Sequence, residues 1–250
     1  MLKNNREELI QEHQPETIKK RLQKPPKPQN ISDAILGGID GCVTTFAVVS
    51  GTIGAGLPST IAIILGFANL IADGFSMGIS NYEAQKAELE VIESVRQSER
   101  NHINKIPDGE REEIRQIFYA KGFRGEILDK VIDTICQDKK VWIDTMLTEE
   151  HGLRKTGLNP WRSAIVTFVA FILVGTIPLL PLLTTFLNTQ QKFIFSTLLA
   201  SFMFFLIGML KSVIVNKPLF TSGLRTLLTG SAAAGLAFFT GYLLRNIFAI

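Results

Sequence analysis

Acidic residues are absent from the last 100 residues of this 250-residue chain, although the chain holds 23 Asp and Glu residues in all. A soluble domain carries charges of both signs over its whole surface, so this asymmetry argues against a single water-soluble globular body. Cysteine is also scarce, and Cys42 and Cys136 alone cannot form a disulfide framework or a four-ligand zinc site. The net charge of +3 is too small, and too scattered along the chain, to indicate a nucleic-acid partner.

Long stretches of the chain lack charge of either sign. Between residues 34 and 82 the only charged side chains are those of Asp40 and Asp73, and a short polar loop at residues 54–60 divides this stretch in two. Segments of about 20 apolar residues are long enough to cross a bilayer as α-helices. Five segments are of this kind: 33–57, 59–83, 163–191, 193–210 and 226–244. The sequence therefore predicts an all-α membrane protein with five transmembrane helices.

Basic residues give the orientation of these helices, because Lys and Arg resist transfer across the membrane during insertion. Of the 26 Lys and Arg residues, 24 fall on one side of the predicted membrane, and only Lys192 and Arg245 fall on the other. We therefore expect a cytoplasmic N-terminus and an external C-terminus. No cleavable signal peptide is expected before residue 33, and the short loops favour a prokaryotic plasma membrane over a vacuole.

This layout divides the chain into four parts. They are a cytoplasmic N-terminal segment (1–32), transmembrane helices one and two (33–83), a cytoplasmic helical insert (84–160) and transmembrane helices three to five (161–250). Within the first part, residues 5–23 have the pattern of an amphipathic helix lying on the cytoplasmic leaflet. A flexible basic tail that ends in the proline-rich segment 24–28 is an equally good interpretation.

The insert holds 28 of the 49 charged residues and has the pattern of helices throughout. Its first helix is expected to continue out of the membrane to about Lys105, where Pro107 stops it. Asp108 is expected to cap a second helix, which ends before Gly122. Two short helices are then expected near residues 126–136 and 138–150. These helices predict a small polar unit that is anchored to a membrane helix.

Carboxylates recur at helical spacing in the insert, together with an imidazole and a thioether. Residues three or four apart share one face of a helix, so the packing of these helices would gather their side chains. Oxygen and nitrogen donors with one sulfur suit iron(II), manganese(II), cobalt(II) or zinc(II) better than calcium. A solvated acidic helix surface is the alternative explanation. The candidate metal ligands are Glu99, His102, Glu110, Glu113, Met146, Glu149 and Glu150.

Asp40 and Asp73 lie inside predicted spans, where an ionisable side chain is energetically costly and usually serves transport, proton relay or pairing. These spans contain no Lys or Arg that could pair with them. Asn69 and Met77 share a helix face with Asp73, and Met77 lies at about the predicted depth of Asp40. Together with Thr44, these residues form the predicted transport pathway for a divalent metal. The alternative is that both aspartates are protonated, hydrogen-bonded members of a structural bundle.

Two sequence runs in these spans are characteristic. Residues 39–51, IDGCVTTFAVVSG, resemble the first-helix signature of the vacuolar iron transporter family, and residues 66–78, GFANLIADGFSMG, resemble its second. The insert is similar to that family at residues 119–123 and 146–153, and the whole resemblance covers roughly residues 33–250.

The resemblance implies a homodimeric five-helix transporter, which is not an enzyme and has no prosthetic group. Its substrates would be iron(II) and related divalent metals such as manganese, cobalt and zinc, moved out of the cytosol in exchange for protons. By the same resemblance, Asp40 and Met77 line the pathway through the membrane. The residues that would gather metal in the insert are Glu99, Glu110, Glu113, Met146 and Glu150.

This chain departs from the family pattern at one ligand. Family members commonly present Glu-x-x-Glu on the helix that leaves the membrane, whereas this chain has Glu99-Arg100-Asn101-His102. A histidine binds metal as a neutral imidazole, so the metal preference and pH dependence are expected to differ. Glu-x-x-His is also half of a ferritin-like di-iron site, which makes a membrane-tethered ferroxidase or iron-storage protein the alternative function.

Overall fold

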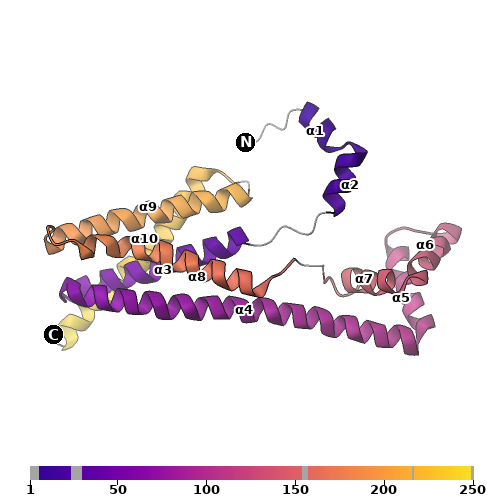
Figure 1. Ribbon diagram of the computed structural model, residues 1–250, viewed down its shortest axis with the longest axis horizontal. Coiled ribbons are helices and arrows are strands. Elements are labelled where there is room, and N and C mark those ends of the chain that lie inside the picture. The colour runs from indigo at the N-terminus through magenta and orange to yellow at the C-terminus, as the bar shows by residue number, and fades with distance from the viewer. Residues whose placement is uncertain (1–5, 24–29, 154–156, 216, 249–250) are drawn as a thin grey trace. The chain divides into compact units, whose positions relative to one another are not determined.

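The computed structural model describes residues 6–23, 30–153, 157–215 and 217–248, and every regular element in them is a helix (Figure 1). In chain order these elements are α1 (Arg6–Glu12), α2 (Pro15–Gln23), α3 (Asn30–Gly54), α4 (Ser59–Lys105), α5 (Pro107–Ala120), α6 (Gly125–Gln137), α7 (Lys139–Glu149), α8 (Pro160–Thr176), the 3-10 helix η1 (Ile177–Leu183), α9 (Thr189–Val215) and α10 (Leu219–Phe248).

The chain folds as two compact units. The membrane unit contains Pro28–Glu83 and Asn159–Ile250, together with the N-terminal residues, and the insert unit contains Ala84–Leu158. Helix α4 contributes its first part to the membrane unit and its last part to the insert unit.

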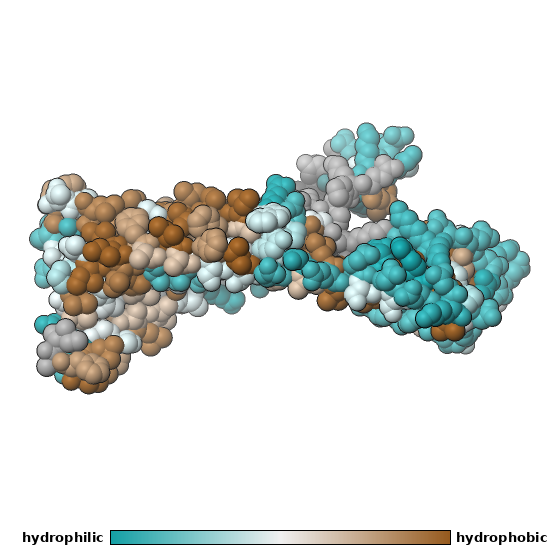
Figure 2. All heavy atoms as spheres, turned by 60° about the horizontal axis from the view of Figure 1, so that its bottom comes forward, coloured by the Kyte–Doolittle hydropathy of each residue, from teal (hydrophilic) through white to brown (hydrophobic). Residues whose placement is uncertain are grey.

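Five helices of the described residues are long and apolar enough to cross a membrane, which confirms the predicted number: α3, α4, α8 with η1, α9 and α10. Their outer side chains are apolar as well, since Ile64, Phe75, Leu198 and Phe202 are all more than half exposed. Figure 2 shows apolar side chains over much of these helices and polar side chains over the insert unit. A large exposed apolar surface of this kind is suited to lipid rather than to water.

The third span differs from its prediction. The uncharged stretch 163–191 does not form one α-helix, because α8 ends at Thr176, the chain continues as a 3-10 helix to Leu183, and α9 begins at Thr189. The physical reason is that Pro178 and Pro181 lack the N–H group that an α-helical hydrogen bond requires.

Helix α3 packs against α8, α9 and α10 in the membrane unit (Figure 1). Cys42, Phe46 and Val49 lie four and three residues apart, so they share one helix face, and all three are buried in the apolar core. Gly41 allows α3 to approach α8 closely, because a Cβ atom at this position would collide with the backbone of Phe171. Small residues in this span therefore serve tight helix packing.

A hydrogen-bonded group joins three helices of the membrane unit. Nδ2 of Asn81 in α4 donates to Oδ1 of Asp33 in α3 at 3.0 Å and to Oγ1 of Thr167 in α8 at 2.8 Å. Asp33 and Thr167 are buried, and Oδ2 of Asp33 has no hydrogen-bond partner among the described residues. Asp33 is therefore a buried carboxylate of the membrane unit, whereas the sequence suggested only a helix start there.

The insert unit has its own apolar core, to which the end of α4 and the helices α5, α6 and α7 all contribute. Ile114, Ile132 and Met146 are fully buried in it, and Trp142 is 7% exposed. Each of these helices presents one apolar face at a spacing of three or four residues, which is how amphipathic helices bury a common core.

The helix boundaries of the insert agree with the sequence at most positions. Helix α4 ends at Lys105, as predicted, and Gly122 has the positive φ of a helix stop. The prediction that Asp108 caps α5 is wrong, because the helix begins one residue earlier, at Pro107. Proline is favoured at the first helical position since its missing N–H would have no partner there.

The N-terminal region forms two short helices instead of the single amphipathic helix that was one prediction for residues 5–23. Helix α1 ends at Glu12 and α2 begins at Pro15. Pro15 cannot continue a preceding helix, because it lacks the N–H group and its ring clashes with the turn before it. The proline-rich segment 24–28 lies outside the described residues.

The two cysteines are both free thiols and lie in different units. Cys42 is fully buried in the core of the membrane unit, where its Sγ lies 4.0 Å from the carbonyl oxygen of Ala200. Cys136 is half-buried in α6 of the insert unit, and burial raises the pKa of its thiol.

Candidate metal site and membrane carboxylates

Two glutamates of the insert unit are buried although they are ionisable. The side chain of Glu99, on α4, is 4% exposed, and that of Glu110, on α5, is 2% exposed. In each of them the oxygen Oε2 has no hydrogen-bond partner among the described residues. A buried polar atom without a partner is energetically unfavourable, so these oxygens indicate a place for a proton or a cation.

His102 lies between the two buried carboxylates. Its Nδ1 atom is 3.3 Å from Oε1 of Glu110 and 4.0 Å from Oε1 of Glu99. Glu99 and His102 are one turn apart on α4, and the chain reversal at Pro107 brings α5 back beside them. The structure therefore brings Glu99, His102 and Glu110 together, as the sequence predicted.

A second group forms around the other side of Glu99. Nε2 of His151 is 3.0 Å from Oε1 of Glu99 and 3.5 Å from Oε2 of Glu150. His151 follows the end of α7, where its N–H donates to the carbonyl of Met146 and Gly152 turns the chain with a φ of 66°. In both Glu99–His102–Glu110 and Glu99–Glu150–His151, the possible ligand atoms lie within 4.8 Å of one another.

The site is strongly electronegative. Burial raises the pKa of Glu110 to about 7, and the negative charges of Glu113 and Glu99 add to the rise. Burial also raises the pKa of Glu150, while the neighbouring His151 opposes that rise. At neutral pH Glu110 therefore holds a proton for part of the time, and a metal cation could take the place of that proton.

The remaining predicted ligands have different surroundings. Met146 is fully buried in the apolar core of the insert unit. Glu113 is exposed, yet its charge acts on both Glu110 and Glu150. Glu149 forms an ion pair with Nζ of Lys121, and it belongs to neither of the two groups of converging atoms.

His151 is the residue that the sequence reasoning missed. It directly follows Glu150 and lies in the run 146–153 that resembles the transporter family. Only three histidines occur in the whole chain, so a histidine beside a candidate ligand was a usable signal. A ferritin-like di-iron site requires a second Glu-x-x-His pair. His151 directly follows Glu150 and does not lie three residues after a glutamate, so it does not form such a pair.

The aspartates Asp40 and Asp73 of the membrane unit lie close enough for their charges to interact. Both are half-buried, as are Asn69 and Met77 on the same face of α4. The hydroxyl of Thr44 donates to the backbone carbonyl of Asp40 at 2.8 Å, so its hydrogen is held within α3. The predicted polar stripe on α4 is therefore helical, and the charge of its carboxylate, Asp73, acts on Asp40 of α3.

These features define a multi-pass membrane protein with a polar insert that gathers carboxylates and imidazoles around two buried glutamates. The model of the VIT family matches residues 31–242, which is most of the chain. The chain therefore belongs to the VIT family, whose members are transporters and not enzymes, and the predicted resemblance is confirmed. This membership favours a transporter over the ferroxidase or iron store that was the alternative.

Named relatives match nearly the whole chain. It is 33% identical over 215 residues to a vacuolar iron transporter of Centaurea cyanus, and the match covers 84% of this chain and 86% of that protein. It is 29% identical over 228 residues to a vacuolar iron transporter of Plasmodium falciparum, with 87% and 83% covered. A vacuolar iron transporter 1 of Arabidopsis thaliana is 28% identical over 211 residues, with 83% of each chain covered.

Proposed function

We propose that this protein is a transporter that moves iron(II), and related divalent metals such as manganese, cobalt and zinc, out of the cytosol in exchange for protons. The observation that carries this proposal is the pair of buried carboxylates, Glu99 and Glu110, each with one oxygen that has no hydrogen-bond partner in the described part of the chain. Its second support is the vacuolar iron transporters among the relatives.

The insert unit would collect the metal. Glu99 is shared by the two groups of converging atoms, so it is the proposed central ligand, with His102 and Glu110 on one side and Glu150 and His151 on the other. Carboxylate oxygens and imidazole nitrogens together suit iron(II), manganese, cobalt and zinc. The proposed ligands of the insert are His151 and those that the sequence singled out: Glu99, His102, Glu110, Glu113, Met146, Glu149 and Glu150.

The membrane unit would pass the metal across the bilayer. Two neighbouring carboxylates in apolar spans repel each other when both are ionised, and a divalent cation or protons relieve that repulsion. Exchange of metal for protons at Asp40 and Asp73 thus couples the two fluxes. Asn69 and Met77 would contribute an amide oxygen and a thioether on the same face of α4, with Thr44 beside Asp40.

The orientation and assembly belong to the same proposal. The insert and the N-terminus would face the cytoplasm and the C-terminus the opposite side, because nearly all Lys and Arg residues fall on one side of the spans. The working unit would be a homodimer in a lipid bilayer, and a prokaryotic plasma membrane is favoured over a vacuole.

Transport can be tested in proteoliposomes that enclose an iron(II)-quenched dye, with an imposed pH gradient. With the parent chain, iron(II) should quench the dye faster when the pH gradient drives protons in the direction opposite to the metal. Asp40→Ala should abolish this iron(II) flux. Glu126→Gln is the control, because its side chain is 82% exposed and lies on the surface of the insert unit. If Asp40→Ala transports iron(II) as fast as the parent, the proposed pathway is wrong.

A further inference from the structure

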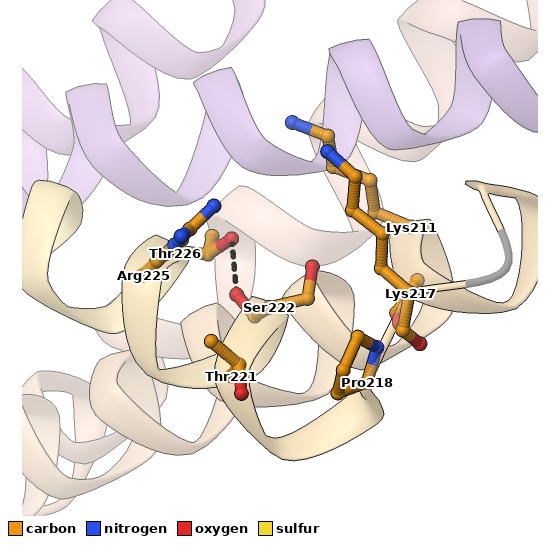
Figure 3. A pocket seen from close by; sticks show the side chains of 8 residues that line it. Lys211, Lys217, Pro218, Thr221, Ser222, Arg225 and Thr226 are labelled. Atoms are coloured by element: carbon orange, nitrogen blue, oxygen red, sulfur yellow. Dashed lines mark hydrogen bonds between the residues drawn. The ribbon is translucent and has the colours of Figure 1, made fainter.

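A pocket of about 510 Å³ lies where α9 and α10 of the membrane unit are joined (Figure 3). This volume is within the range of roughly 300–1,000 Å³ that small-molecule sites occupy. Three cationic side chains line the pocket, those of Lys211, Lys217 and Arg225, and Figure 3 shows their charged ends on the same side of it, with the hydroxyl of Ser222 between them. We refer to it as the α9–α10 pocket.

The three cations of this pocket have no acidic counterpart. No carboxylate of the described residues forms an ion pair with Lys211, Lys217 or Arg225. The chain itself cannot supply one locally, because no Asp or Glu follows Glu150. Like charges that line one pocket repel each other, so an anion from outside the chain would be bound favourably.

Hydrogen bonds fix the backbone beside this pocket. The hydroxyl of Ser212, which is buried, donates to the carbonyl of Lys217, and the N–H of Lys217 donates to the carbonyl of Ser212 at 3.3 Å. The two helices also cross closely at Gly208, where a Cβ atom would lie 2.8 Å from the Cα atom of Gly223. The helix crossing therefore fixes the backbone from which the three exposed cationic side chains extend.

The surroundings of the pocket are apolar. Leu210, Leu219 and Phe220 are 53%, 51% and 69% exposed, and they adjoin pocket residues in the sequence. Because α9 and α10 are both membrane spans, the pocket lies where apolar spans meet a polar connection. Cations beside exposed apolar side chains at the end of a span match a phospholipid, whose phosphate and acyl chains are covalently joined.

We propose that the α9–α10 pocket binds a phosphate group, and that this phosphate is the headgroup of an anionic phospholipid. Arg225 offers a planar set of donors that fits two phosphate oxygens, whereas Lys211 and Lys217 act as point charges. The hydroxyl of Ser222 adds a neutral donor. This site is separate from the metal ligands and does not depend on what the protein transports.

Native mass spectrometry of the full-length protein in neutral detergent can test the proposal. The probes are dioleoyl phosphatidylglycerol, zwitterionic dioleoyl phosphatidylcholine and inorganic phosphate. The parent chain should retain phosphatidylglycerol in preference to phosphatidylcholine. Lys211→Gln with Arg225→Gln should weaken phosphatidylglycerol binding roughly 25-fold, at about fivefold per cationic side chain.

The matched control is Arg162→Gln with Lys192→Gln, which removes the same charge from an exposed and a half-buried position outside the pocket. This control should bind phosphatidylglycerol like the parent, and an equal loss in both double variants would overturn the proposal. If the pocket variant does not fold, the single change Arg225→Gln carries the same test with about a fivefold loss. Binding of inorganic phosphate without phosphatidylglycerol would overturn the assignment to a lipid.

Discussion

Glu110 offers the sharpest test of the buried carboxylate site. Burial raises its pKa from the ordinary value of 4.5 to about 7. Between these two pH values the folded protein binds a proton that the unfolded chain has already lost, so the free energy of unfolding falls as the pH rises. At about 1.4 kcal/mol per pH unit, the ionised carboxylate costs the fold roughly 3 kcal/mol at pH 8.

Glu110→Gln removes the ionisable group and keeps the shape of the side chain. The variant should match the parent at about pH 4, where the parent's carboxyl is neutral, and should be up to roughly 3 kcal/mol more stable at pH 8. It should also lose the stabilisation that manganese(II) or zinc(II) gives the parent at pH 8, because a ligand of the metal is gone.

Tryptophan fluorescence during urea unfolding can follow the insert unit alone. Trp142 is 7% exposed in the insert core and Trp161 is 64% exposed in the membrane unit, so a Trp161→Phe background leaves one informative probe. Glu112→Gln is the control on the same helix, since its side chain is 54% exposed and should leave the pH dependence unchanged. If the urea midpoint of Glu110→Gln still falls with rising pH as steeply as that of the parent, the assigned role of Glu110 is wrong.

Three further changes test other features. Asp138→Ala should lower the stability of the insert by about 1 kcal/mol in urea, because the N–H groups at the start of α7 lose their cap; an unchanged midpoint would contradict this. Gly41→Val should prevent the close packing of α3 on α8, so that size-exclusion chromatography shows aggregated protein in place of a folded peak. Met146→Leu should change the free energy of unfolding by less than about 1.5 kcal/mol, since the core volume is nearly conserved; calorimetric zinc(II) affinity should fall, because a proposed thioether ligand is lost, and an unchanged affinity would remove Met146 from the ligand set.

The number of membrane spans was predictable because it rests on the absence of charge over long stretches, a signal that packing cannot override. The ends of the helices were less predictable. Pro107 was identified as a stop for α4, but the same residue also starts α5, and Asp108 was a competing cap one position later. In the third span, two prolines changed the type of helix without changing the hydropathy that marked the span.

The candidate site was predictable where its members lie on one helix or on consecutive helices. Glu99 and His102 are one turn apart, and a tight turn returns Glu110 to them, so local geometry suffices. His151 follows the end of its helix, and its direction depends on the turn at Gly152, which helical spacing does not describe. The hydrogen bonds from Asn81 reach Asp33, 48 positions away, and Thr167, 86 positions away, so only the tertiary structure reveals them.

Because only one of the two free thiols is accessible, chemical labelling of the unaltered chain can report which side of the membrane the insert unit faces. Cys42 is sealed in the core of the membrane unit, whereas Cys136 is partly accessible in the insert unit. A membrane-impermeant maleimide applied at about pH 8.5, which offsets the raised pKa of Cys136, should therefore label one position without any engineered cysteine. If the insert faces the cytoplasm, inside-out vesicles take up the label and right-side-out vesicles do so only after they are opened.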